Sequence, residues 1–294
     1  MSNVSGEDGA ADIYTFDMQD TGELYGAAAT RELDRRLIEE YGIAGYSLMC
    51  KAAAGCWREL CRYWPQAQRI VVLCGGGNNG GDGYEVARLA LAAGCEVNLF
   101  EFNGGKTRGD AATARQAWVD DGGTCQAWTD STSLADDTEV IVDAIFGTGL
   151  SRPPAGMAAA AIEAVNTAHA QDTGVLAVDV PSGLDVDRGA ALGVCVEADI
   201  TVTFIGRKFG LYTGAGPDYA GRVIFDPLAD AVFGIDPPPR KARVLDVAEL
   251  RHRLPRRPRD PGARGRRAAD GARVRGGDPR RGGAHRPGRH GGRR

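Results

Sequence analysis

The chain has 294 residues, of which 43% are hydrophobic and 25% are charged, and its formal net charge is −4. This length suits one large domain or two small ones, and the absence of any run of about 18 apolar residues argues against a membrane span. The charge is unevenly distributed: residues 1–250 hold 19 basic and 36 acidic side chains, whereas residues 251–294 hold 16 Arg and 3 Asp. An acidic body of this kind predicts no nucleic-acid partner.

The cysteines and histidines limit which metal sites and catalytic groups the protein can contain. Seven scattered cysteines without a Cys-x-x-Cys pair predict reduced thiols and a cytoplasmic location rather than a zinc site. Residues 1–11 are polar and lack the apolar core of a signal peptide, which supports the same location. Only one of the four histidines, His169, lies in the acidic body, so acid–base chemistry must fall to Asp, Glu, Lys or Tyr.

Two helices are predicted near the start of the chain, after a flexible N-terminus over residues 1–13. Asp20 and Glu23 have the spacing of a capping box, which predicts a helix from there to about Tyr41. A second helix, over residues 47–64, carries an apolar stripe at 3–4 spacing. Such a stripe is typical of core or subunit packing.

Strands and helices then alternate. The strand sequences at 70–73, 140–146 and 175–180 are apolar apart from Asp143 and Asp179, and they do not alternate with polar residues, as in strands buried on both faces. We therefore predict an α/β fold, a three-layer α/β/α Rossmann-like doubly wound structure with a mainly parallel sheet. The expected strands are 69–74, 96–100, 124–128, 139–146, 174–180, 199–204 and 222–225, and the expected helices between them are 84–93, 110–121 and 155–170.

A glycine-rich segment follows the first of these strands, with six glycines in the nine residues 75–83. Glycine adopts positive φ easily and has no Cβ, so such a backbone can approach a ligand closely, and the next helix directs free N–H groups toward it. The segment therefore predicts a nucleotide or phosphate cradle. Gly75, Gly77 and Gly80 also match a dinucleotide fingerprint, with Glu96 or Glu101 as the ribose ligand, and a plain βα turn is a further alternative.

The strands at 139–146 and 174–180 also end in polar segments. The first comprises Asp143 near the strand end and residues 147–153 after it, and the second comprises Asp179 at the strand end and Ser182 after it. In a doubly wound sheet, ligands bind outside the carboxyl ends of the strands, so these segments are expected to lie near the glycine segment. Asn79, Asp143 and Ser182 offer only oxygen ligands, which favours a group 1 or group 2 cation.

Three motifs in this order resemble a known family. Cys-Gly-Gly-Gly-Asn-Asn-Gly-Gly-Asp-Gly (74–83), Val-Asp-Ala-Ile-Phe-Gly-Thr-Gly (142–149) and Val-Asp-Val-Pro-Ser-Gly-Leu-Asp (178–185) are similar to the YjeF N-terminal domain of the NAD(P)H-hydrate epimerases. The resemblance extends over about residues 14–232 and predicts one domain over residues 14–235. It includes the sequence Arg31-Glu-Leu-Asp34 and the strand end before Lys208.

The resemblance implies an isomerase that interconverts the R and S forms of hydrated NADH and NADPH (NADHX and NADPHX) at C6, a nicotinamide-nucleotide repair reaction. It implies a homodimer and a potassium ion bound by Asn79, Asp143 and Ser182. The substrate-binding residues that it implies are Asn78, Asn79, Gly80, Gly81, Asp82, Gly147, Thr148, Gly149, Leu150, Ser151, Arg152, Pro153 and Asp179.

Inversion at C6 needs a proton donor and a proton acceptor around a ring-opened or dehydrated species. Asp143 and Asp179 are the candidate catalytic carboxylates, and Lys106 is the candidate paired acid. Two other functions remain open: an NAD-dependent oxidoreductase that uses the dinucleotide fingerprint, and a non-catalytic module that binds nucleotides or proteins.

The end of the chain has a different composition. Residues 236–260 are predicted to be a linker, and residues 261–294, rich in Arg, Gly and Pro, are predicted to be disordered because they cannot form a core. This composition is typical of a shifted reading frame, with an Arg/Gly-rich nucleic-acid tail as the alternative. In many bacterial relatives a dehydratase domain follows, and its glycine-rich motifs do not occur here.

Overall fold

A computed structural model describes residues 22–102, 106–229, 232 and 235–244. The expectations for residues 1–13 and 261–294 lie outside the described residues. Seven strands form one sheet in which every pair of neighbours is parallel. Their spatial order is β11 (Arg222–Asp226), β9 (Ile200–Phe204), β6 (Gly174–Val178), β5 (Val140–Ala144), β2 (Arg69–Cys74), β3 (Glu96–Glu101) and β4 (Cys125–Ala127).

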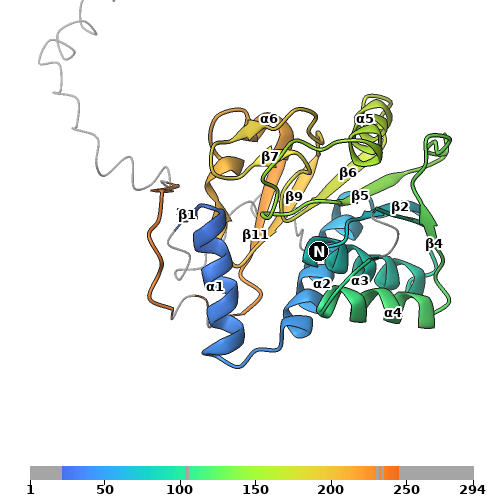
Figure 1. Cartoon of the computed structure of the whole chain (residues 1–294). Helices are drawn as coiled ribbons and strands as arrows, with labels where there is room; N and C mark the ends of the chain where they lie inside the picture. Colours follow the sequence, from blue (N-terminus) through green and yellow to red (C-terminus); the bar gives the residue numbers. More distant parts are fainter. Residues whose placement is uncertain (1–21, 103–105, 230–231, 233–234, 245–294) are drawn as a thin grey trace, which may run out of the picture. The chain divides into compact units, whose positions relative to one another are not determined.

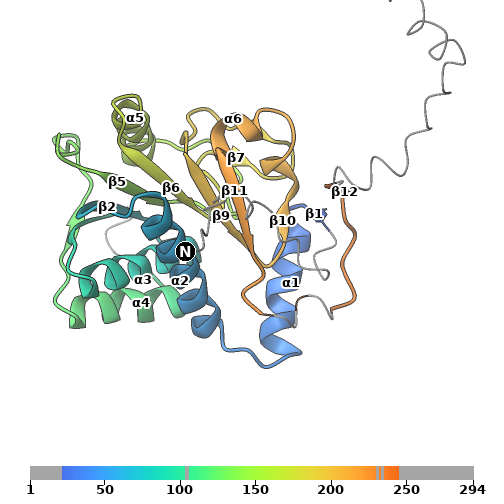
Figure 2. The same cartoon turned by 180° about the vertical axis from the view of Figure 1, so that it is seen from behind.

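Helices cover both faces of this sheet (Figures 1 and 2). Val72 and Val142 pack in one core with helices α2 to α4, whereas Leu73 and Ile141 pack in a second core with α5. Neighbouring residues of one strand thus face opposite layers, and the predicted three-layer α/β/α fold is confirmed. No helix among the described residues is long and apolar enough to cross a membrane. The helices are α2 (Gly45–Tyr63), α3 (Asn78–Ala92), α4 (Asp110–Asp120), α5 (Met157–His169) and the short α6 (Gly216–Ala220).

The N-terminal helix α1 (Ala27–Glu39) follows a strand of a small second sheet. In this sheet, β1 (Glu23–Tyr25) pairs in parallel with β10 (Arg207–Lys208) and antiparallel to β12 (Ala242–Arg243). The predicted capping box is therefore wrong, because Glu23 lies in a strand and Gly26 is the residue before the helix. Strand β12 falls within the predicted linker, so this part of it belongs to the folded body. A hairpin of β7 (Leu184–Asp185) and β8 (Ala190–Ala191) and the 3-10 turn η2 (Phe209–Leu211) complete the elements.

The glycine segment is more helical than its composition indicates. Helix α3 begins at Asn78, six residues before the expected start, and no glycine in the segment has positive φ. The glycines serve close packing: a Cβ on Gly80 would lie 1.9 Å from the carbonyl oxygen of Gly75, and one on Gly81 would lie 2.4 Å from Cε of Met49. Because glycine has a low helix propensity, the sequence did not predict the first turn of α3. Tertiary contacts stabilise this turn.

The strand order creates a switch point between β2 and β5. From β2 the chain continues outward through β3 and β4, and it then returns to β5 on the other side of β2. Ligands of doubly wound folds bind in the crevice at such a point. Here the two turns are in close contact, since a Cβ on Gly75 would lie 1.9 Å from the carbonyl oxygen of Ile145.

Candidate functional site

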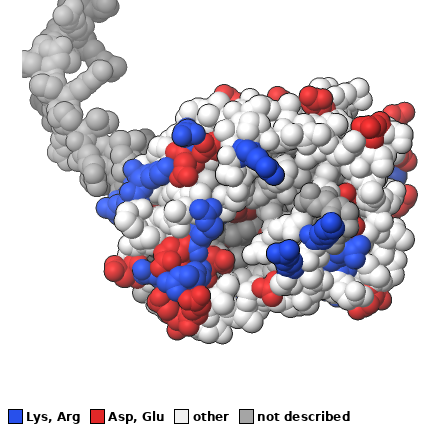
Figure 3. All heavy atoms as spheres, in the orientation of Figure 1, with Lys and Arg blue, Asp and Glu red and all other residues white. Residues whose placement is uncertain are grey.

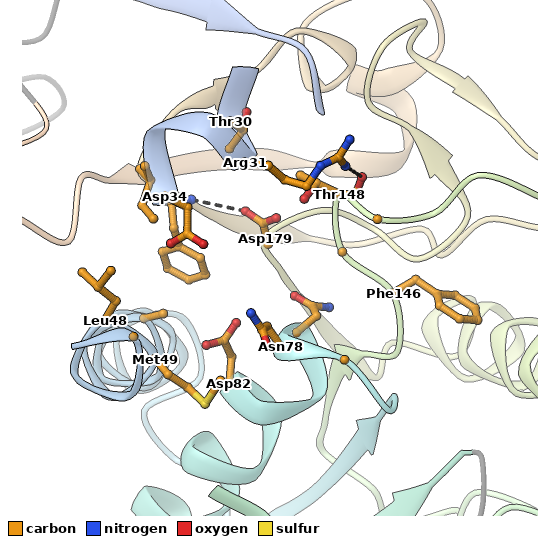
Figure 4. Close-up of a pocket in the computed structure, with 18 of the residues that line it drawn as sticks. Thr30, Arg31, Asp34, Leu48, Met49, Asn78, Asp82, Phe146, Thr148 and Asp179 are labelled. Atoms are coloured by element: carbon orange, nitrogen blue, oxygen red, sulfur yellow. Dashed lines mark hydrogen bonds between the residues drawn. The ribbon is translucent and has the colours of Figure 1, made fainter. Parts of the chain in front are cut away.

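A cavity of about 1030 Å³ opens at this switch point. Its wall combines α1, α2, the glycine segment, the turn after β5, Asp179 and the end of β9 (Figure 4). Most of the predicted site residues line it: Asn78, Asn79, Asp82, Lys106, Gly147, Thr148, Gly149, Leu150, Ser151, Arg152 and Asp179. Gly80, Gly81, Pro153, Asp143 and Ser182 are not among the lining residues.

Asp179 stands at the end of β6 in an unusual backbone conformation. Its φ is 67°, in the left-handed region that few residues other than Gly, Asn and Asp occupy. The carboxylate forms an ion pair with Lys208 and accepts hydrogen bonds from Thr203 Oγ1 at 3.3 Å and Phe204 N at 3.4 Å. A positive φ at a residue other than glycine strains the backbone. Such strain persists only where neighbouring groups fix the residue, and it is common at functional sites.

Lys208 is the buried counter-charge of this site. Only 1% of it is exposed, and its Nζ also donates a hydrogen bond to the carbonyl oxygen of Phe204 at 2.7 Å. The pairing was not predicted, because Lys208 is 29 residues from Asp179 in the chain. The only feature of the sequence that pointed to Lys208 was its position at the end of a motif shared with the family. The predicted paired acid, Lys106, lines the same cavity.

Two further carboxyl groups share the cavity with Asp179. Asp34 comes from α1 and Asp82 from α3, and their side chains converge toward the space in front of Asp179 (Figure 4). Burial and the negative charges of Asp179 and Asp34 raise the pKa of Asp82 well above its usual value, against the opposing charge of Lys208. Burial likewise raises the pKa of Asp34. One buried ammonium group, that of Lys208, thus acts on three carboxyl groups.

Asp143 lies behind the cavity wall. It is fully buried and accepts hydrogen bonds from Ser182 Oγ at 2.6 Å, Ser182 N at 2.7 Å and Ile145 N at 3.2 Å. Burial raises its pKa to about 6, although the bonds from Ser182 and Ile145 act in the opposite direction. Since the carboxylate is enclosed by these partners and does not line the cavity, the geometry does not support direct proton transfer from Asp143 to a ligand.

Asn79 has an unsatisfied side chain. Its Oδ1 and Nδ2 are both buried, and neither has a hydrogen-bond partner among the described residues. A buried amide without partners is unfavourable by about 1–3 kcal/mol, so a ligand or ion at this position would relieve it. Gly147 is next to it, with a Cβ position 3.3 Å from Asn79 Oδ1, and Phe146 N donates to Ser182 Oγ at 2.8 Å.

The mouth of the cavity carries basic groups. Arg31 on α1 lines the cavity and donates a hydrogen bond to the carbonyl oxygen of Thr148 at 3.2 Å, so it connects α1 to the turn after β5. Further along α1, acidic and basic side chains cluster on the surface (Figure 3), where Arg35 forms ion pairs with Glu32 and Glu39. Arg152 also lines the cavity.

The proposed ribose ligand of the dinucleotide fingerprint is otherwise engaged. Glu101 accepts a hydrogen bond from Tyr84 Oη at 2.7 Å and forms an ion pair with Arg115. Glu96 begins β3 and therefore lies at the sheet edge away from the cavity. Glu101 ends β3 but is committed to Tyr84 and Arg115, and neither carboxylate lines the cavity, so the structure does not support a ribose contact by either residue.

The fold and the cavity define a doubly wound α/β protein with a ligand site at its switch point. Residues 45–210 match the family model described as YjeF-related protein N-terminus. The chain is 42% identical to the NAD(P)H-hydrate epimerase of Limosilactobacillus fermentum over 204 residues, which are 69% of this chain and 96% of that protein. This protein belongs to the YjeF N-terminal family.

Longer relatives share the same region. The chain is 39% identical to the bifunctional NAD(P)H-hydrate repair enzymes Nnr of Coxiella burnetii and Escherichia coli. The matches cover 81% and 78% of this chain but only 48% and 44% of those proteins, so the chain spans less than half of their length. A crystal structure of yeast YNL200c superposes with a TM-score of 0.60 at 22% identity, covering 75% of this chain and 97% of the yeast chain, which supports the fold.

Proposed function

We propose that this protein is an NAD(P)H-hydrate epimerase, which interconverts the R and S forms of NADHX and NADPHX at C6. The observation that carries the proposal is the 42% identity to an epimerase over 96% of that enzyme's length. A cavity at the switch point, large enough for a nucleotide, supports it. C6 bears a hydroxyl group and the ring nitrogen, so inversion there requires only proton transfers around a transient intermediate.

The charges of the cavity favour one orientation of the substrate. The diphosphate is anionic and suits the N-terminus of α3, the turn at Gly147–Ser151 and the nearby Arg152. The hydrated nicotinamide ring is neutral and suits the acidic space in front of Asp179. In this orientation the Asp179 carboxylate, which is paired with Lys208, accepts a proton from the substrate, and Lys106 remains a candidate donor.

A coupled assay tests the proposal. The full-length protein is incubated with an R/S mixture of NADHX and a separate dehydratase that consumes only the S form. We expect the R form to be drained completely in the presence of the protein, and faster than by spontaneous epimerisation. Ligand binding without acceleration would instead favour the non-catalytic module, and hydride transfer to carbonyl compounds would favour the oxidoreductase.

Potassium is the proposed cofactor, held by Asn79 Oδ1, the Asp143 carboxylate and Ser182 Oγ. The unpartnered amide of Asn79 and the buried charge of Asp143 fit a cation that takes oxygen ligands. A bound cation also favours the ionised form of Asp143.

We expect substrate binding to weaken several-fold when potassium is replaced by a bulky organic cation at equal ionic strength. Equilibrium titration with NADHX in the two salts measures this, and a Ser182→Ala variant should lose most of the difference. Equal affinities of the wild-type protein in both salts would rule out the cation site.

Assembly and location are proposals as well. We propose a homodimer, for which light scattering at micromolar concentration must give twice the mass of the chain.

We propose that the protein is located in the cytoplasm, since all seven cysteines are free, a state typical of reducing compartments. Detection of the protein outside the cytoplasm by cell fractionation would contradict this.

A further inference from the structure

The proposed reaction needs a proton donor as well as the acceptor Asp179, and the cavity contains a carboxyl group suited to this role. Asp34 lies on α1, outside residues 45–210 that the family model matches. It lines the cavity and points to the space that Asp179 faces (Figure 4). We propose that Asp34 is a further catalytic residue, which donates a proton to the substrate opposite the acceptor Asp179. This inference rests on the proposed function.

Asp34 differs in its partners from several charged groups near the cavity. Asp179 is paired with Lys208, and Arg35 is paired with two glutamates of α1. For Asp82, the other carboxyl group of the cavity, no hydrogen bond or ion pair is found among the described residues. For the half-buried Asp34 no hydrogen bond or ion pair is found among the described residues. A half-buried carboxyl group without structural partners is free to exchange a proton with a ligand.

The charges of the cavity favour a neutral carboxylic acid. Asp34, Asp82 and Asp179 share the cavity with one buried ammonium group, and the substrate adds a diphosphate. If all three carboxyl groups were ionised, their repulsion would oppose binding. Burial, with the charges of Asp179 and Asp110, raises the pKa of Asp34 against the opposing charge of Lys208, and the pKa of Asp82 is raised as well.

Helix α1 is fixed in place at both sides of the cavity. Its register is set by β1, which pairs Tyr25 with Lys208 of β10, and Arg31 joins the helix to Thr148 across the cavity mouth. The helix that carries Asp34 is thus fixed to the same strand end that carries the partner of Asp179. Precise placement of donor and acceptor is what general acid–base catalysis requires.

The chemical step balances without any other reactant. Asp34 gives its proton to the ring nitrogen N1 as the C6–N1 bond breaks and its electron pair moves to N1. Asp179 takes the proton of the C6 hydroxyl group, whose oxygen becomes the oxygen of an aldehyde. Rotation about the C5–C6 bond presents the other face of the aldehyde to N1. On ring closure the proton on N1 returns to Asp34 and the proton on Asp179 returns to oxygen, which leaves C6 inverted.

The test compares Asp34→Asn, Asp34→Glu and Lys106→Gln in the full-length protein. We expect Asp34→Asn to lower kcat by roughly 10²–10⁴-fold, with KM and thermal stability little changed because no structural bond is lost. Asp34→Glu should restore part of the rate. Lys106→Gln, at the alternative donor, should lower kcat far less than Asp34→Asn does. Glu32→Gln is the matched control, since it removes a charge from the same helix outside the cavity and should behave as wild type.

The pH profile distinguishes proton donation from a structural role. Asp34 must be protonated to act, so the wild-type rate should fall as the pH rises through its pKa, and Asp34→Asn should lose this falling limb. The charged groups that face Asp34 are Lys208, Asp179, Asp82 and Asp110 from other elements, and Arg31 and Arg35 from α1.

Two outcomes overturn the inference while leaving the proposed function intact. One is an active wild type with an equally active Asp34→Asn variant. The other is loss of kcat in Lys106→Gln without loss in Asp34→Asn, which would make Lys106 the donor. A wild-type protein that does not accelerate epimerisation would contradict the proposed function itself.

Discussion

Asp179→Asn is expected to lower the epimerisation rate by about 10²–10⁴-fold, the usual contribution of a positioned acid or base. Asparagine keeps the shape of the side chain and one acceptor oxygen for Lys208, but it cannot take up the proton. It also tolerates the positive φ of this position, so the substitution adds no backbone strain. Coupled turnover of NADHX at saturating substrate measures the effect.

The same substitution is expected to destabilise the fold. Lys208 would keep its charge while only 1% of it is exposed, and breaking a buried ion pair costs about 3–5 kcal/mol. We expect about 2–3 kcal/mol here, below that range, because the Asp179 side chain is 14% exposed and faces the cavity. Urea denaturation measures the change in the free energy of unfolding.

A second substitution separates the two effects. In Asp179→Asn/Lys208→Met the unpaired charge is gone, so much of the lost stability should return while the rate stays low. If the double variant recovers activity together with stability, Asp179 has only a structural role. If the single variant turns over at the wild-type rate, the assignment of Asp179 as the proton acceptor is wrong.

Gly80→Ala and Gly77→Ala are expected to affect different properties, although the two residues are three positions apart. A Cβ on Gly80 would lie 1.9 Å from the carbonyl oxygen of Gly75, and backbone cannot rotate away as a side chain can. The turn between β2 and α3 must therefore shift, at a cost of about 1–3 kcal/mol or more. We expect a large loss of stability and, with it, of substrate binding.

Gly77 has the opposite environment. A Cβ there would meet no protein atom within 4 Å, and its φ of −102° is open to alanine. We expect a loss of stability below about 1 kcal/mol, since alanine is a poorer residue than glycine at a helix N-cap. Because Gly77 lines the cavity, the added methyl group should nevertheless weaken NADHX binding by about tenfold or more, which corresponds to 1.4 kcal/mol or more.

Chemical denaturation and substrate titration of both variants provide the test. Unchanged affinity in Gly77→Ala would show that the substrate does not approach the backbone at this residue. Wild-type stability in Gly80→Ala would show that the contact with Gly75 is easily relieved, and the packing role assigned to this glycine would be wrong.

Local patterns in the sequence were sufficient for the fold class. Continuous apolar runs such as residues 70–73 are required where a strand is covered on both faces, and their alternation with helical segments leads to a parallel sheet. The same order predicts polar turns at one edge, and the residues at 78, 147–152 and 179 do line one cavity. These features depend on near neighbours in the chain, which is why the sequence alone reveals them.

Contacts between distant residues were decided by the tertiary structure. Asp143 lies near the end of β5 and Asp179 directly follows the neighbouring strand β6, yet Asp143 is fully buried against Ser182 and Asp179 faces the cavity. The start of α3 at Asn78 runs against glycine's low helix propensity and depends on packing against Gly75 and Met49. Lys208 and Asp34 reach the site only because β10 pairs with β1 and thereby positions α1, and a pairing between strands so far apart in the chain leaves no local pattern in either segment.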